Sequence, residues 1–259
     1  MQELLDSSEL DLLAEAASKN KNITSLQWKM QDKYDIDTTA FYKALAKLQK
    51  LQTFYVVASV VAEIEYCGID FSGIAALVRE YRHLHVLHIA EVNGMLRLKR
   101  PWDTVVLAVA ISNHPSLVEI RLFIFGDSLE TSENMFRAIA TIKTLKIVDL
   151  DSGLDGDLHG SLFFSNHLHY IFQAPALANC ELSGLEFVGD NLAAAIKANR
   201  SVERFELTRC CESSGQTDNL AKALSSHTTM VSCKFRLFGV GPEFYTAFSQ
   251  GLAQNTVMA

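Results

Sequence analysis

The feature that most constrains this chain is a phrase of three apolar residues, spaced apolar-x-x-apolar-x-apolar, that returns along almost its whole length. The triplets are Ile23-Leu26-Trp28, Leu51-Phe54-Val56, Leu84-Leu87-Ile89, Leu117-Ile120-Leu122, Leu145-Val148-Leu150, Leu177-Cys180-Leu182, Val202-Phe205-Leu207 and Met230-Cys233-Phe235, and Val257 begins a candidate ninth. Their first members lie 25 to 33 residues apart. Self-similarity at a period of about 20 to 50 residues indicates stacked repeats that share one core.

The composition fits a single continuous domain of such repeats. Of the 259 residues, 49% are hydrophobic and 20% are charged, which is enough apolar material for a buried core. The formal net charge is −7, and that balance argues against a general nucleic-acid binder, whose affinity depends on a basic surface.

The chain carries no sign of export or membrane insertion. It opens Met1-Gln2-Glu3-Leu4 without a basic segment and an apolar stretch, and the run from Phe54 to Ala62 is too short to cross a bilayer. The five cysteines are scattered, and two of them, Cys180 and Cys233, occupy inward positions of the repeat. We therefore expect a cytoplasmic protein with free thiols, no cofactor and no contact with a membrane.

The triplets predict short strands, and the stretches between them predict amphipathic helices. Asp, Ser or Thr at the starts, and proline in a first turn, are typical of helix N-termini. The predicted helices are 40–49, 70–81, 103–111, 132–142, 158–172, 190–198, 218–226 and 242–254.

This pattern resembles the leucine-rich repeat, L-x-x-L-x-L-x-x-N/C-x-L, in which each unit contains a strand and a helix. The long units are similar to the ribonuclease-inhibitor-like class, which is also seen in Ran GTPase activators, tropomodulins and NOD-like receptors. The resemblance covers residues 22–259, about eight repeats, and residues 1–21 look like an N-terminal helical cap. It implies an α/β horseshoe with parallel strands on the concave face and helices on the convex face. The Asn/Cys position departs from the pattern, since only Cys210 fits it.

Three clusters with possible chemistry have simpler explanations. His83, His85 and His88 alternate with core leucines and lack a further convergent ligand, so we expect no metal site. Cys210 and Cys211 are better explained as a repeat position followed by a turn than as a redox pair. The Asp151–Asp157 segment lacks the spacing and closing Glu of a calcium loop. With no phosphate-binding loop or nucleophile elbow, the sequence does not favour an enzyme, and we expect no catalytic residues.

The surface that could carry function is the strand face opposite the helices. Its middle positions, in order of repeat, are Gln27, Tyr55, His88, Arg121, Asp149, Glu181, Glu206 and Lys234. Asp149, Glu181 and Glu206 would form an acidic strip between basic ends at Arg121 and at Lys234 and Arg236, and Tyr55 and Phe123 are candidate aromatic anchors. Like charges about 4.8 Å apart repel each other unless a cationic partner or counterions neutralise them. The alternative interpretation is a solvated face on which the charges are random.

A second candidate is the insertion that lengthens the third unit. Arg97, Lys99, Arg100 and Trp102 make it basic and aromatic within an acidic chain. Insertions in repeat proteins map to loops, often on the binding face. The alternative is that Trp102 packs beside the following helix and the charges are solvated.

The sequence therefore predicts a non-enzymatic module that binds a protein partner on its concave strand face. A rigid surface loses little entropy on binding, which is its advantage. Two alternatives stay open: a regulatory or GTPase-activating module that acts on a partner enzyme, and a self-associating fragment that forms a homodimer through its C-terminal repeat.

Overall fold

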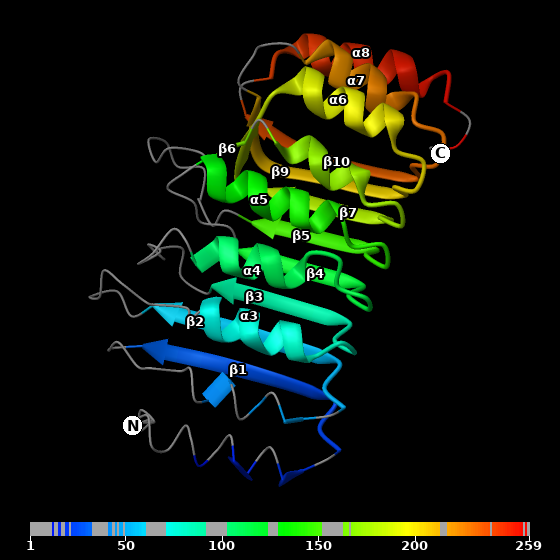
Figure 1. The fold of residues 1–259 in the computed structure, drawn as a ribbon. Helices are drawn as coiled ribbons and strands as arrows, with labels where there is room; N and C mark the ends of the chain where they lie inside the picture. The colour runs from blue at the N-terminus through cyan, green and yellow to red at the C-terminus, as the bar shows by residue number, and fades with distance from the viewer. Residues whose placement is uncertain are drawn as a thin grey trace.

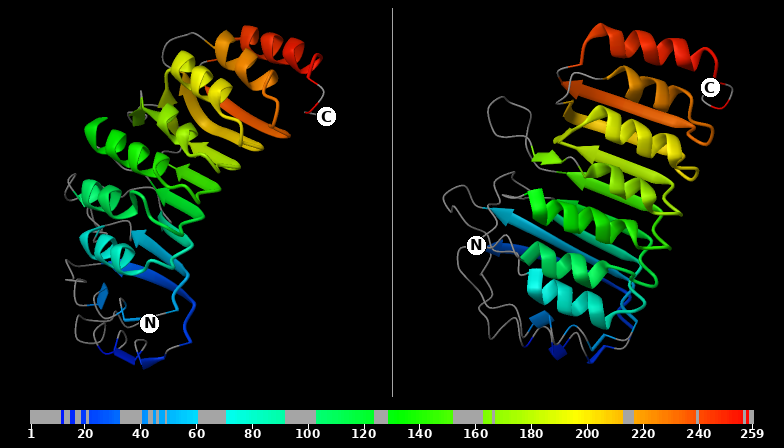
Figure 2. Two further views of the ribbon diagram at one scale, coloured as in Figure 1. Left: turned by 45° about the vertical axis from the view of Figure 1, so that its right-hand side comes forward. Right: turned by 45° about the horizontal axis from the view of Figure 1, so that its top comes forward.

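The computed structural model is an open parallel sheet with helices on one side (Figure 1). It describes residues 12, 15–16, 19–20, 22–32, 41–42, 45, 47–48, 50–60, 71–91, 103–123, 129–151, 163–165, 167–212, 217–238, 240–255 and 257. Figure 2 shows the strands lining the inside of a bend and the helices its outside. The fold is thus an α/β leucine-rich-repeat solenoid.

Each of the eight predicted triplets coincides with a strand. These strands are β1 (Ser25–Asp32), β2 (Thr53–Val60), β3 (Val86–Glu91), β4 (Glu119–Phe123), β5 (Ile147–Asp151), β7 (Asn179–Ser183), β9 (Arg204–Glu212) and β10 (Ser232–Phe238). All their pairings are parallel and follow chain order. A regular register results because every unit offers the same alternation of inward and outward side chains.

The helices form the second layer, and most begin within a residue or two of the predicted start. They are α3 (Phe71–Glu80), α4 (Asp103–Ile111), α5 (Leu129–Ala140), α6 (Gly189–Ala198), α7 (Asp218–Ser225) and α8 (Pro242–Leu252). Phe41, Tyr42 and Leu45 are also helical, and helical residues 12, 15, 16 and 19 belong to the predicted cap. Among the residues described, no helix combines the length and the apolar character needed to span a bilayer.

The core lies between the two layers and is built from the triplets. Leu84, Leu87 and Ile89 are no more than 1% exposed, and the other internal units repeat this burial. Burying one such side chain stabilises the fold by about 1.5 to 3 kcal/mol. Because each unit buries its triplet against its neighbours, the stability of the solenoid is shared along its length.

The predicted helix over 158–172 is wrong. The described residues there form β6 (Phe163–Ser165) and a short 3₁₀-helix, η1 (Leu168–Gln173), and β6 pairs with an unpredicted strand, β8 (Leu185–Phe187). Pro175 disfavours helical backbone in the residue before it, and Ala174 is indeed extended, with φ −64° and ψ 117°. The segment before Pro175 is therefore too short for a full helix. A hollow of about 620 Å³ lies between η1 and α6.

In four units a polar side chain three residues before the triplet, or before the place where the next triplet would begin, joins its unit to the one before it. His114 Nε2 lies 3.0 Å from the carbonyl oxygen of Tyr81, and His227 Nε2 lies 3.0 Å from that of Asn199. Asn199 Nδ2 donates to the Phe172 carbonyl at 2.8 Å, and Asn255 Nδ2 donates to the Ser225 carbonyl at 2.6 Å. We call His114, Asn199, His227 and Asn255 the polar spine.

The polar spine corrects the predicted start of the ninth triplet. Asn255 Oδ1 accepts from the Val257 amide at 2.7 Å, as Asn199 Oδ1 accepts from Ser201 at 2.8 Å. Residue 257 therefore corresponds to Ser201, one position before the triplet, and it lies in a bend and is 38% exposed. A ninth unit would begin at residue 258, which is outside the described residues.

Candidate functional site

The predicted middle positions form one continuous row across the sheet. Gln27 pairs with Tyr55, Tyr55 with His88, and the pairing continues through Arg121, Asp149, Glu181 and Glu206 to Lys234. We call these eight residues the central row. The alternation of side chains along each strand turns them away from the core, so the row lies on the strand face.

A groove of about 610 Å³ runs along this face. Six predicted site residues line it: Tyr55, His88, Arg121, Asp149, Glu181 and Arg236. Glu206 and Lys234 are the next members of the central row, and Phe123 lies on β4 opposite Asp151 of β5. Arg97, Lys99, Arg100 and Trp102 lie outside the described residues, so the insertion remains a prediction from sequence.

At one end of the groove, Glu119 links two members of the central row. Its Oε1 accepts from Arg121 Nε at 2.7 Å and lies 2.8 Å from His88 Nε2. The ring of Tyr55 packs edge-on against His88, with centroids 4.4 Å apart. Burial lowers the pKa of His88 and outweighs the opposing effect of Glu119. Burial also disfavours the Glu119 charge, but the bonds to Arg121 and His88 outweigh it and leave the pKa of that carboxyl below its ordinary value.

The middle of the groove holds two carboxylates, Asp149 and Glu181, with little positive charge nearby to neutralise them. The side chain of Asp149 is 24% exposed, and its nearest cation is Arg121, whose Nη1 lies 3.6 Å from Oδ2. Burial and the neighbouring Glu181 raise the pKa of Asp149 from 3.8 to about 6. Burial and the neighbouring Glu206 likewise raise the pKa of Glu181. Glu181 has no ion-pair partner among the described residues, whereas Glu206 accepts from Lys234 Nζ at 2.6 Å.

Arg209 is a groove residue that the sequence does not reveal. It has φ 56°, a left-handed conformation that is uncommon outside glycine, and it interrupts the pairing of β9 with β10 as a bulge. Its side chain extends from β9 to Ser183 of β7 and Asp151 of β5. Nη2 donates to Ser183 Oγ at 2.9 Å and to the two Asp151 oxygens at 3.2 and 3.1 Å. The bulge thus gives Asp151 its own cation.

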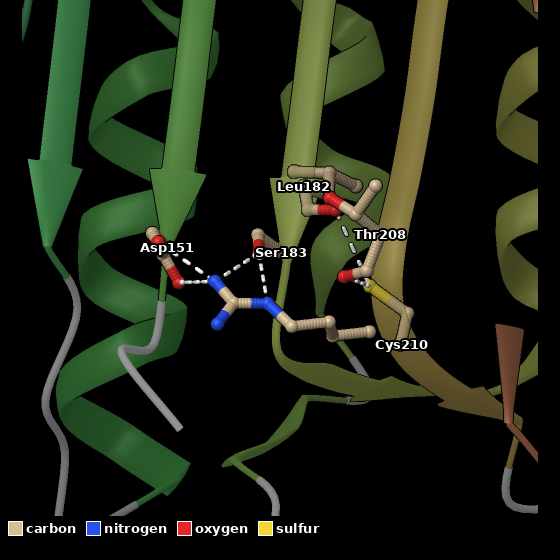
Figure 3. Close-up of polar contacts among 6 residues, drawn as sticks. Asp151, Leu182, Ser183, Thr208 and Cys210 are labelled. Carbon is tan, nitrogen blue, oxygen red and sulfur yellow. Dashed lines mark hydrogen bonds and ion pairs between the residues drawn. The ribbon is translucent and has the colours of Figure 1, made fainter. Parts of the chain in front are cut away.

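Cys210 follows the bulge and occupies the Asn/Cys position of the repeat. It is fully buried, and its Sγ lies 3.3 Å from the carbonyl oxygens of Leu182 and Thr208 (Figure 3). Burial raises the pKa of this thiol to about 12, so it stays protonated. Cys180, Cys210 and Cys233 are free cysteines. Cys210 is therefore a structural thiol and not a nucleophile.

The described residues contain no group of three or more His, Cys, Asp and Glu side chains that could hold a metal ion. The groove offers instead a row of fixed charges beside an aromatic pair. Such a surface can select a ligand by charge and shape, and it presents a cationic group with two carboxylates on adjacent strands.

Comparison with known proteins does not assign a family. No protein-family model matches the chain, and no curated protein matches it. Among the solved structures that match is a tropomodulin C-terminal domain of Caenorhabditis elegans, at 9% identity and a TM-score of 0.29. That match covers 97% of this chain and 93% of the tropomodulin chain. The repeated parallel register of the strands identifies the fold independently of this match.

Proposed function

We propose that this chain is a non-enzymatic protein-recognition module whose strand face holds a basic segment of a partner protein. The proposal is carried by Asp149 and Glu181, which stand side by side on the groove floor with little to neutralise them. An isolated carboxylate is costly to keep half-buried, and a cation from a partner would offset that cost. Tyr55 and His88 would pack against apolar parts of the same segment.

The proposal extends to two further parts of the predicted site. The partner would also contact Phe123 of β4 and the insertion with Arg97, Lys99, Arg100 and Trp102. The chain would belong to the ribonuclease-inhibitor-like class and act in the cytoplasm. A nucleic acid is disfavoured as partner because its phosphates would meet the acidic floor of the groove.

The experiment is affinity capture from a native lysate with the purified chain and with Glu181→Lys combined with Glu206→Lys. Each lysine replaces an attraction for a cation with a repulsion, so capture of the specific partner should fall by at least about tenfold. The control is Glu80→Lys with Glu203→Lys, which makes the same charge change at two exposed positions that do not line the groove. Circular dichroism confirms that both variants are folded. A partner that both double variants retain equally excludes the strand face.

A second candidate is self-association through the last repeat. Cys233 and Phe235 of β10 are half-buried, whereas their counterparts Phe205 and Leu207 of β9 are at most 2% exposed. Strand β10 pairs only with β9 among the described strands, so its other edge can accept a strand. Light scattering on the purified chain should then give the mass of a dimer, and a monomer at about 100 µM would exclude this candidate.

A further inference from the structure

The groove is long, and its direction is set by the sheet. Its lining residues come from seven strands, from Tyr55 on β2 to Arg236 on β10. Neighbouring strands lie about 4.8 Å apart, so the floor extends about 29 Å across them. An occupant that uses the whole floor must therefore lie across the strands, along the axis of the solenoid.

From β2 to β9, the backbone of the floor has no free hydrogen-bonding groups to offer a partner. Strands β2, β3, β4, β5, β7 and β9 each have a parallel partner on both sides, so their amide and carbonyl groups are used within the sheet. A partner segment that lies on this face must satisfy its own buried backbone. An α-helix does so internally, whereas an extended segment would leave part of its backbone unpaired.

The spacing of the under-compensated carboxylates also favours a helix as the partner segment. Asp151 is paired with Arg209, Glu206 with Lys234, and Glu119 with Arg121, which leaves Asp149 and Glu181 on adjacent strands as the under-compensated pair. Side chains at i and i+4 of a helix lie about 5 to 6 Å apart. Alternate side chains of an extended segment lie about 6.6 Å apart, which fits the interval between strands less well.

We propose that the occupant is a basic α-helix of a partner protein, lying along the solenoid axis. The proposal rests on the proposed function and adds the form of the partner. Two cationic side chains one turn apart face Asp149 and Glu181, and the part of the helix beyond Arg121 lies over Tyr55 and His88. A helix of about 19 residues spans the 29 Å floor at 1.5 Å per residue.

The test uses three synthetic peptides of about 20 residues with one composition, an alanine and glutamine background that carries two arginines and two prolines. The first peptide is helical, with the prolines at its N-terminus and the arginines at i and i+4. The second is also helical, but its arginines lie at i and i+2 on different faces. The third has the arginines at i and i+4 and the prolines in the centre, where they break the helix. Fluorescence anisotropy measures their binding to the full chain, to Glu181→Gln and to a control, Glu203→Gln.

The first peptide should bind at least about tenfold tighter than the other two, and Glu181→Gln should remove that advantage while Glu203→Gln leaves it. Equal binding of the three peptides that still depends on Glu181 would overturn the helix and leave the basic-partner surface in place. If the peptides bind equally well to wild type and to Glu181→Gln, both the helix proposal and the role of the groove floor in the proposed function are wrong. If no peptide binds below about 1 mM, the helix proposal alone is overturned.

Discussion

The charged side chain of Asp149 would help to bind a basic partner, but it lowers the stability of the free protein. Its carboxyl is three-quarters buried, faces Glu181 across one strand interval, and has only a 3.6 Å contact with Arg121. The charged form therefore costs free energy in the folded state that it does not cost in the unfolded chain. Residues at binding sites often carry such a cost because the ligand removes it.

Replacing this carboxylate should stabilise the free protein. Because the folded pKa of about 6 lies above the ordinary 3.8, the contribution of Asp149 to stability is fully present below 3.8 and is lost as pH rises through 6. Asp149→Asn should thus raise the free energy of unfolding at pH 7 by about 1 to 2 kcal/mol. The gain over wild type should shrink as pH falls from 7 toward 4, as measured by urea unfolding. A variant that is less stable than wild type at pH 7 would show that Asp149 is well compensated.

Among the elements, the eight strands of the triplets and the central row follow from the sequence, but three local features do not. The apolar triplets determine eight strands and their register because inward and outward positions alternate without a break. Strands β6 and β8 lack a triplet, and the 3₁₀-helix depends on where Pro175 interrupts the unit. The bulge at Arg209 is equally hidden, since a positive φ at a non-glycine residue is imposed by neighbouring strands and not by local sequence.

Two substitutions of Arg209 can separate the backbone strain of the bulge in β9 from the loss of the ion pair to Asp151. Arg209→Ala and Arg209→Gly both remove the ion pair to Asp151, but only glycine adopts φ 56° without a clash between its side chain and the backbone. Arg209→Gly should therefore be more stable than Arg209→Ala by about 1 kcal/mol in urea unfolding. Equal stabilities, or a more stable alanine variant, would mean that the bulge relaxes once the arginine is gone.

At the scale of the whole molecule, neighbouring units are held together by apolar packing and by the polar spine. The sequence shows only an Asn or His three residues before some triplets, and it does not reveal that these side chains bond to carbonyl groups of the preceding unit. The two histidines of the polar spine, His114 and His227, are buried, and burial lowers the pKa of each below its ordinary value despite a hydrogen bond to a backbone carbonyl. Because units in a solenoid contact only their neighbours, loss of one such link weakens one interface.

Acid should therefore weaken the interface that His227 spans, and asparagine should remove this sensitivity. The neutral ring donates from Nε2 to Asn199 and accepts at Nδ1 from Thr229, 3.4 Å away, and protonation ends that acceptance. Since the folded pKa is lowered, the stability due to neutral His227 is present above 6.5 and is lost as pH falls through the folded pKa. Asparagine already fills this position as Asn199 and Asn255, so His227→Asn should keep the urea midpoint near the wild-type value at pH 7.5. At pH 5 the urea midpoint of His227→Asn should exceed that of the wild type, and adding His114→Asn should increase the difference. The control His83→Asn, at an exposed position, should leave the midpoint unchanged at both pH values. Equal loss of stability on acidification in wild type and in the double spine variant would mean that other groups cause the acid sensitivity.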